Sequence, residues 1–151
     1  MIEENMNNNI YPIASVWKRF AAFSIDTLIV LPFYMIIVLI LNKIDLNIGI
    51  NQEVLSNFLY NPMFLVFILF GWIYFKGQSI GQKIIKIKIV KMDNSDIDYK
   101  NALLRVVGWF ACNITLGIGF LIMFLNKNKR GLHDFTSNSK VIDISNGEQI
   151  F

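Results

Sequence analysis

The chain has few of the residue types that build disulfides, metal centres and acid–base sites. Its 151 residues include one cysteine, Cys112, and one histidine, His133. A single cysteine excludes an intrachain disulfide and a cysteine-based metal site. The sequence also lacks a nucleophile–base pattern, an HExxH motif and any Cys/His spacing typical of a bound metal. We therefore expect no enzyme, no metal and no cofactor.

A phosphate-binding loop is also missing, although residues 77–83, GQSIGQK, superficially resemble one. A P-loop needs four residues between its glycines and a lysine directly after the second glycine. Here three residues separate Gly77 from Gly81, and Gln82 precedes Lys83. This spacing excludes nucleotide hydrolysis at the loop, and we interpret the glycines as a close turn of the chain.

Charged residues are nearly absent from three long stretches. Residues 20–41 contain one charged side chain, Asp26, and residues 58–75 and 106–125 contain none. About 20 mostly apolar residues suffice for a helix to cross a bilayer. The hydrophobic share of 54% is above that of an ordinary soluble domain, and the mean hydropathy is +0.48. We predict one all-α membrane domain over residues 1–151, with transmembrane helices at 20–41 and 58–75.

Charge in the flanking segments predicts the orientation of these helices. The N-terminal tail, residues 1–13, is polar and acidic, so it lacks the basic start of a signal peptide. Basic residues are concentrated before the first helix and in the loop at 76–105. Because loops rich in Lys and Arg face the cytoplasm, we place the N-terminus and this loop there. The net charge of +3 fits anionic lipid headgroups, and we expect the lipid bilayer as partner and no nucleic acid.

The third apolar segment, residues 106–125, allows two interpretations. A full crossing would place the basic residues that follow it outside, against the charge rule. A re-entrant hairpin that turns at residues 115–119 would return the C-terminal tail, residues 126–151, to the cytoplasm. Every basic residue except Lys43 would then share one side. We favour the hairpin, although 20 residues also suffice for a straight span.

The loop at 76–105 carries a strand pattern. Residues 83–91, KIIKIKIVK, alternate isoleucine with lysine, which is typical of a β-strand with one apolar and one basic face. Residues 97–99 form a candidate return strand after a turn, and residues 140–144, KVIDI, also alternate. If the third segment is a hairpin, these residues can pair with the first strand. We therefore predict a small cytoplasmic β-hairpin or three-stranded unit.

Asp26 is the most costly charge of the chain if residues 20–41 span a bilayer. A carboxylate at the centre of a membrane helix costs roughly 2.5–3.5 kcal/mol on insertion scales and commonly marks a functional site. Arg19 lies on the same helix face, about 10 Å earlier along the axis, and leans away from Asp26, so we expect no direct ion pair. Asp26 then needs a proton, a cation such as Na⁺, water or another partner. In the structural alternative it binds a neighbouring helix through a basic side chain, namely Arg105, Lys83 or His133.

A second polar cluster lies at residues 129–134, KRGLHD. An unperturbed histidine titrates near neutral pH, and Asp134 can accept from the ring of His133 or cap a turn. The structural alternative is an interfacial turn whose polar groups satisfy each other. The candidates for ion binding or transport are therefore Arg19, Asp26, His133 and Asp134.

Four motifs together resemble the RDD family of small bacterial membrane proteins, which is named for one arginine and two aspartates. The first is SVWKRFAAFSID, which holds Arg19 and Asp26. The others are KGQSIGQKIIKIKIV, NALLR and NKRGLHDFTSNSKVI, with Asp134 as the second aspartate. The resemblance extends from Ala14 to about Ile142. The chain departs from the family in its short third apolar segment and in the polar residues TSNS before the last strand.

The resemblance implies a multi-pass protein in the plasma membrane of a bacterium, and it implies little mechanism. Members of the family are described as transporters of unspecified ligands, and cation/proton antiport has been suggested for some. Our leading hypothesis is transport of a small cation or proton, or an accessory role in transport, with Asp26 as the ion-binding group. Three apolar segments are too few to enclose a pathway, so we expect a homo-oligomer or a partner membrane protein. The alternative hypothesis is a non-transporting scaffold that recruits a partner through its cytoplasmic β-unit.

Overall fold

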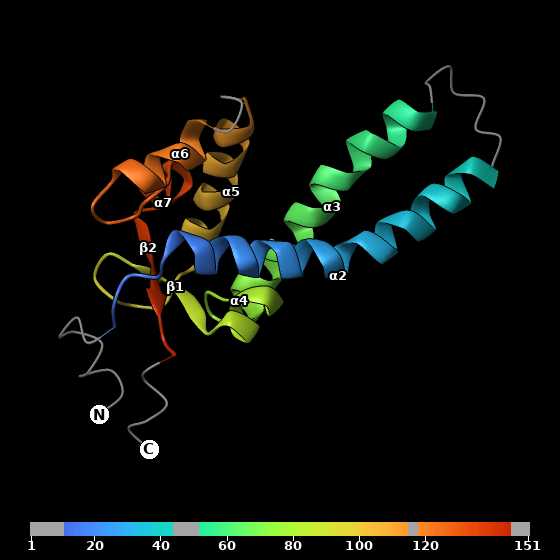
Figure 1. Cartoon of the computed structure of the whole chain (residues 1–151). Helices are drawn as coiled ribbons and strands as arrows, with labels where there is room; N and C mark the ends of the chain where they lie inside the picture. The colour runs from blue at the N-terminus through green and yellow to red at the C-terminus, as the bar shows by residue number, and fades with distance from the viewer. Residues whose placement is uncertain (1–10, 44–51, 115–117, 146–151) are drawn as a thin grey trace.

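The computed structural model describes residues 11–43, 52–114 and 118–145, and most of them are helical. Figure 1 shows α2 running across the molecule and diverging from α3 on one side, while the sheet and the remaining helices gather on the other. This arrangement confirms the prediction of a mostly helical fold with a small sheet. The elements in chain order are α2 (Val16–Lys43), α3 (Gln52–Tyr74), α4 (Ile80–Ile85), β1 (Ile87–Lys91), α5 (Tyr99–Ile114), α6 (Ile118–Leu125), α7 (Leu132–Thr136) and β2 (Ser139–Asp143).

Among the described residues, α2 is the one helix that is long and apolar enough to cross a membrane. Its segment Val16–Leu41 has a mean hydropathy of 2.4, and only 11% of its most apolar 18-residue stretch is buried inside the protein. Leu28 and Phe33 are more than 60% exposed, as expected for side chains that face lipid. The apolar part of α3, Tyr60–Tyr74, is shorter than a standard span. A second transmembrane helix is therefore not confirmed within the described residues.

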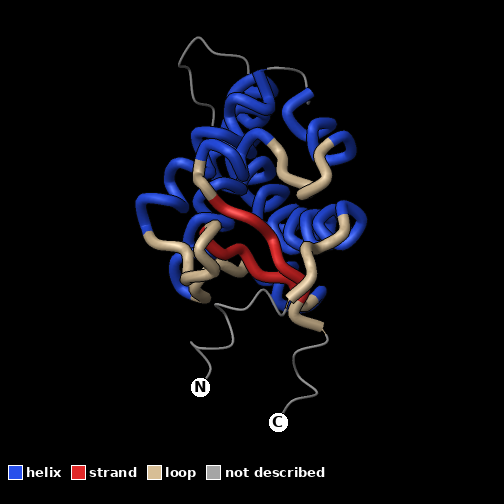
Figure 2. The backbone as a smooth tube through the Cα atoms, turned by 90° about the vertical axis from the view of Figure 1, so that its left-hand side faces the viewer, coloured by secondary structure: helices blue, strands red, loops and turns tan. Residues whose placement is uncertain are grey.

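The sheet consists of β1 and β2, which pair antiparallel and lie side by side in Figure 2. Ile87 faces Asp143 and Ile89 faces Val141 across the ladder. Both isoleucines are fully buried, because this face of the strand packs against the helices. The pairing confirms the prediction that the C-terminal strand returns to the isoleucine-rich strand.

The strand predicted over residues 83–91 is shorter than expected. Its first residues belong to helix α4, because Ser79 and Gln82 form a capping box that starts a helix there. Lys86 ends this helix in the left-handed region, with φ of 60°. The alternating pattern is therefore realised only from Ile87 onward.

The predicted return strand at residues 97–99 is wrong. Asp98 accepts a hydrogen bond from the backbone N–H of Asn101 at 2.8 Å and so caps the start of α5, which takes Tyr99 into a helix. Only an isolated bridge joins Val90 to Asp96, and a second one joins Ile13 to Ile142. The three-stranded unit is therefore not confirmed, and the described sheet has two strands.

The third apolar segment is divided between α5 and α6, which contact each other. A Cβ on Gly119 of α6 would lie 2.5 Å from the Sγ of Cys112 on α5, so the two helices approach closely at this glycine. The segment is thus not one straight helix, and it brings the chain back to α7 and β2. Residues 115–117 of the predicted turn lie outside the described residues.

Candidate functional site

Asp26 lies in the interior, 2% exposed, where α4 packs against α2. Its Oδ2 accepts a hydrogen bond from the hydroxyl of Ser79 at 2.6 Å, and its Oδ1 accepts one from the backbone N–H of Gly81 at 2.7 Å. Both donors belong to the start of α4, where free N–H groups and the helix dipole favour a negative group. The carboxylate therefore fastens α4 to the middle of α2.

Gly81 permits this contact because it has no side chain. A Cβ at this position would lie 2.2 Å from the carbonyl oxygen of Ala22 and 3.0 Å from the Cγ of Asp26. Ala22 and Gly81 are both buried, so the helices meet backbone to backbone. The structure thus gives Asp26 a neighbouring helix as its partner, through Ser79 and Gly81 rather than through a basic side chain.

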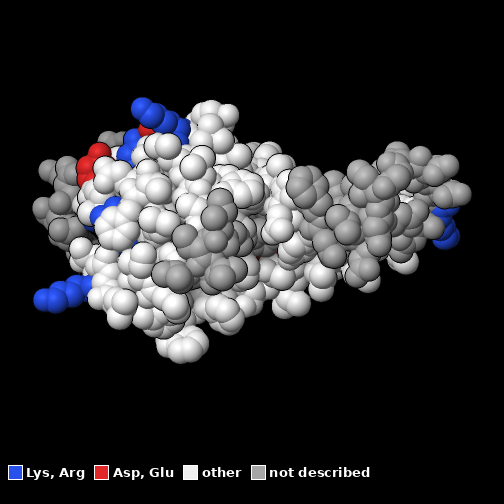
Figure 3. Space-filling model, turned by 90° about the horizontal axis from the view of Figure 1, so that it is seen from above, with Lys and Arg blue, Asp and Glu red and all other residues white. Residues whose placement is uncertain are grey.

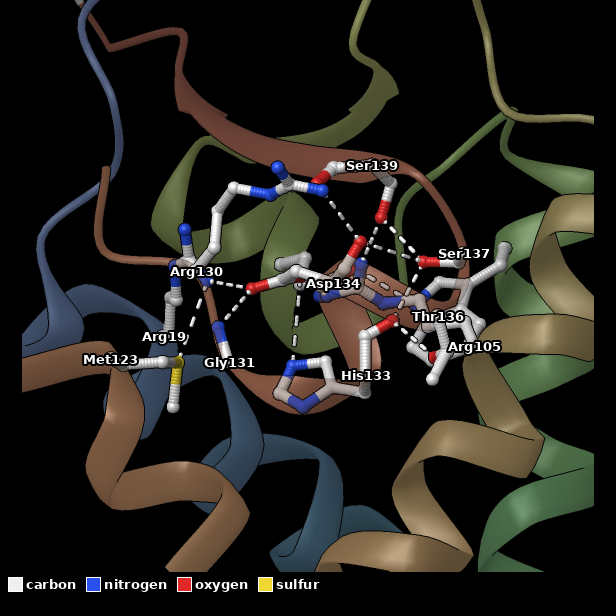
Figure 4. A network of polar contacts seen from close by, with 12 residues as sticks. Arg19, Arg105, Met123, Arg130, Gly131, His133, Asp134, Thr136, Ser137 and Ser139 are labelled. Carbon is white, nitrogen blue, oxygen red and sulfur yellow. Dashed lines mark hydrogen bonds and ion pairs between the residues drawn. The ribbon is translucent and has the colours of Figure 1, made fainter. Parts of the chain in front are cut away.

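Asp134 is fully buried at the centre of a second cluster, shown in Figure 4. Its Oδ2 accepts hydrogen bonds from Nη1 of Arg19 at 2.7 Å and from the N–H of Gly131 at 2.9 Å. Its Oδ1 lies 2.6 Å from Nη2 of Arg105. One carboxylate therefore joins α2, α5 and the start of α7.

Arg105 extends this cluster to the sheet. Its Nη1 donates a hydrogen bond to the hydroxyl of Ser139 at 2.5 Å, and Ser139 lies 2.7 Å from the hydroxyl of Ser137. The guanidinium carbon lies 5.3 Å from the ring centroid of Trp72, within the range of a cation–π contact. Arg105 thus connects α5 to β2 and α3.

The electrostatics of the cluster leave it with excess positive charge. Burial alone would raise the pKa of Asp134, but the positive charges of Arg105 and Arg19 hold it well below its usual range, so Asp134 is ionised. Burial lowers the pKa of His133 to about 4 despite the opposing charge of Asp134, so its imidazole is neutral at pH 7. His133 therefore does not titrate near neutral pH as an unperturbed histidine would. Two guanidiniums face one carboxylate.

Three nitrogen atoms of these arginines remain without a hydrogen-bond acceptor among the described residues. They are Nε and Nη2 of Arg19 and Nε of Arg105, and all three are buried. The side chain of Arg19 is 9% exposed and that of Arg105 is 3% exposed. Buried donors usually find a partner, because leaving one unsatisfied costs about 1–3 kcal/mol.

A cavity of about 510 Å³ lies beside both clusters. Its wall includes Arg19, Asp26, Arg105 and His133, and it is otherwise mostly apolar. All three tryptophans of the chain contribute to it. The apolar and aromatic lining residues are Val16, Trp17, Phe20, Phe23, Phe64, Leu65, Ile68, Trp72, Trp109, Met123, Phe124 and Val141.

The predicted site residues are thus divided between two places. Arg19, His133 and Asp134 lie together, whereas Asp26 lies at α4, and all of them border the cavity or touch a residue that does. Arg105 was predicted only as one of three alternative partners of Asp26, whereas in the structure it binds Asp134 and Ser139. Its position directly before an uncharged stretch of 20 residues was the available signal. Within the described ranges, no three His, Cys, Asp or Glu residues are placed to hold a metal ion.

Comparisons with known proteins agree with the motifs that the clusters contain. The uncharacterized protein YckC of Bacillus subtilis (strain 168) is 34% identical over 150 residues, which cover 93% of this chain and 91% of that protein. The uncharacterized protein YxaI of the same organism is 26% identical over 147 residues, covering 85% and 96%. No solved structure matches the chain. Because the model of the RDD family matches residues 13–138, with Arg19, Asp26 and Asp134 inside the match, the chain belongs to the RDD family.

Proposed function

We propose that this RDD-family protein is a multi-pass protein of the bacterial plasma membrane, with α2 and α3 as spans and the sheet on the cytoplasmic side. Figure 3 shows charged side chains at the two ends of the visible face and an uncharged surface between them. On α3, Val66 and Phe70 are more than 60% exposed, which favours contact with lipid. Lys18, Lys88 and Lys91 lie at the sheet end, where basic residues indicate the cytoplasmic side.

Within this arrangement, we propose that the protein binds a lipid-sized molecule in the cavity. The observation that carries this function is a mostly apolar cavity with a few buried polar groups, bordered by α2, α3, α5 and α6. Its volume of about 510 Å³ falls within the roughly 300–1,000 Å³ of known ligand pockets. Phe20 and Phe124 line it and are also exposed, so the cavity opens on the surface where lipid would lie.

The three tryptophans make this binding measurable. A fatty acid brominated on its chain should quench their fluorescence when it enters the cavity of the full-length protein in neutral lipid nanodiscs. We expect saturable quenching that weakens by about tenfold or more in Ile68→Phe, because Ile68 lines the cavity and is buried. Leu28→Phe is the matched control, since Leu28 is 67% exposed and is not part of the lining. Quenching that never saturates, or is the same in both variants, would contradict the proposal.

Transport of a proton or a cation such as Na⁺ through Asp26 is the second candidate. It is favoured by one observation: Asp26 is buried and borders the cavity, and among the described residues no cationic group forms an ion pair with it. We expect Asp26→Asn to abolish cation-dependent proton flux in liposomes while insertion stays intact. Asp26→Glu, which keeps the charge, is the control. Equal flux from Asp26→Asn and the unchanged protein would rule out this role.

Recruitment of a partner by the sheet is less well supported. The outer edge of β2 is engaged by Ala14, whose N–H donates to Val141, and by Pro12, whose carbonyl accepts from Asp143. Along the outer edge of β1, the N–H groups of Ile89 and Lys91 donate to the carbonyl oxygens of Gly77 and Ser95. A partner strand would have to displace these contacts.

We also propose a homo-oligomer, because two spans with one hairpin cannot enclose a transport pathway.

A further inference from the structure

We propose that the ligand of the cavity is an anionic single-chain amphiphile, whose carboxylate or phosphate headgroup binds to Arg19 and Arg105. This inference rests on the proposed function and specifies the ligand class for the same cavity. It starts from the unsatisfied donors. Nε and Nη2 of Arg19 are neighbouring N–H groups on one side of the guanidinium, and neither has an acceptor among the described residues.

This side of a guanidinium matches the geometry of the proposed headgroup. A carboxylate or a phosphate can accept both N–H groups in a bidentate contact, which a neutral hydroxyl cannot match. Asp134 occupies only Nη1 of Arg19 and Nη2 of Arg105. Nε of Arg105 supplies a further buried donor beside the same cavity. The cluster therefore has both the charge and the free donors for a second anion.

The charges around this position favour an anion despite Asp26. Among the described residues, Asp134 is the one carboxylate that forms ion pairs with Arg19 and Arg105, and His133 adds no charge because it is neutral at pH 7. Asp26 also borders the cavity, but it lies about 10 Å further along α2, and both of its oxygens are bound to the start of α4. A headgroup in contact with the arginines would be much closer to them than to Asp26, so attraction exceeds repulsion.

The remainder of the cavity suits an acyl chain. Phe23, Phe64 and Trp109 lie in contact with one another, with ring centroids 5.4–6.4 Å apart, and all three line the wall. Phe20 and Phe124 at the surface are 62% and 61% exposed, so a chain can extend from the arginines toward lipid. One polar end and one apolar path define a single-chain amphiphile rather than a free inorganic anion.

The test compares three brominated probes that share one acyl chain: the fatty acid, the monoacylglycerol phosphate and the neutral monoacylglycerol. They are titrated against the full-length protein in phosphatidylcholine nanodiscs, with tryptophan quenching as the readout. We expect the acid or the phosphate to bind at least about tenfold more tightly than the monoacylglycerol. Whichever of the two binds more tightly identifies the source of the headgroup. Inorganic phosphate should compete only weakly, because it lacks the chain.

Variants locate the headgroup. Arg19→Lys keeps the charge but loses the planar pair of N–H donors. The anionic probe should therefore lose about tenfold in affinity, while the affinity of the monoacylglycerol is unaffected. Unchanged monoacylglycerol binding also shows that the variant is folded. Arg105→Lys is the second variant, and Lys43→Gln, which removes an exposed cation at the other end of α2, is the matched control.

The outcomes separate this inference from the function on which it rests. Equal affinity for the acid and the monoacylglycerol would overturn the anionic specificity and leave binding in the cavity intact. Saturable quenching by none of the three probes would overturn both. Anion selectivity that survives in Arg19→Lys and Arg105→Lys, and disappears in Lys43→Gln, would place the headgroup elsewhere and contradict the proposed site.

Discussion

At the scale of single residues, the buried charges of this chain act as fasteners between segments that are distant in sequence. Asp134 lies 115 residues from Arg19, and Asp26 lies 53 residues from Ser79. Removing one partner of a buried ion pair typically costs about 3–5 kcal/mol, because the other charge is left uncompensated. Arg19, Asp26 and Asp134 thus have a structural role in addition to any role in ligand binding.

His133 gives a prediction about pH. Its pKa falls from 6.5 to about 4 in the folded protein, chiefly because of burial, so below pH 6.5 the unfolded chain binds a proton that the folded chain does not. The free energy of unfolding should therefore fall as the pH drops from 6.5 toward 4. The expected loss is about 3 kcal/mol, at about 1.4 kcal/mol for each pKa unit.

Unfolding in neutral detergent, followed by circular dichroism between pH 7.5 and 4, measures this loss. His133 is the only histidine of the chain, so no other imidazole titrates in this window. His133→Gln should flatten the dependence of stability on pH between 6.5 and 4. The same slope in the variant would show that other groups are responsible.

At the scale of elements, the segment after α3 shows how a cap can override a strand pattern. Ser79 and Gln82 satisfy each other's backbone N–H groups, and the hydroxyl of Ser79 also donates to Asp26. This local gain starts a short helix in which two isoleucines of the alternating run, Ile84 and Ile85, are placed. The strand begins only where β2 and the helices cover the apolar face, so tertiary contacts decide its start.

The contact of α4 with α2 also depends on Gly81. Because a Cβ on Gly81 would collide with backbone atoms of Ala22, no rotation of a side chain relieves the contact. The GQSIG stretch is therefore a helix-docking motif as well as a turn. The sequence indicated a close approach at these glycines, but the partner helix lies more than 50 residues away.

At the scale of the whole molecule, the pairing of β1 with β2 restricts the topology. Two paired strands must lie on the same side of a bilayer, so the segment between them has to return to the side from which it starts. Helices α5 and α6 follow β1 and precede β2 in the sequence, and they contact each other. The structure therefore favours the helical hairpin over the straight span.

Accessibility of single cysteines tests this topology. In a Cys112→Ala background, Lys100→Cys and Lys127→Cys should react with a membrane-impermeant thiol reagent from the same, cytoplasmic side, and Lys43→Cys from the other. All three lysines are exposed in the structure. Reaction of Lys100→Cys and Lys127→Cys from opposite sides would instead establish a full crossing by residues 106–125.

The sequence by itself indicated the apolar, membrane-like character of α2, a C-terminal strand able to pair with the isoleucine-rich strand, and three of the charged residues in the two clusters, Arg19, Asp26 and Asp134. These features follow from the period and length of apolar runs and from the rarity of charge within them, which are local properties of the chain. Motifs with matching charges also indicated the family. The share of the fold that could be predicted is thus the share that local patterns control.

Only the tertiary structure decided which groups of the chain bind to one another. Which cation binds Asp134, what satisfies Asp26 and how the aromatic side chains surround a cavity all depend on contacts between segments separated by tens of residues. Such contacts are fixed by how whole helices pack, because a buried charge accepts whichever donor the packing brings within about 3 Å. The contact of Arg105 with Asp134, and the helix that begins at Tyr99 in place of a strand, therefore became visible only in the folded molecule.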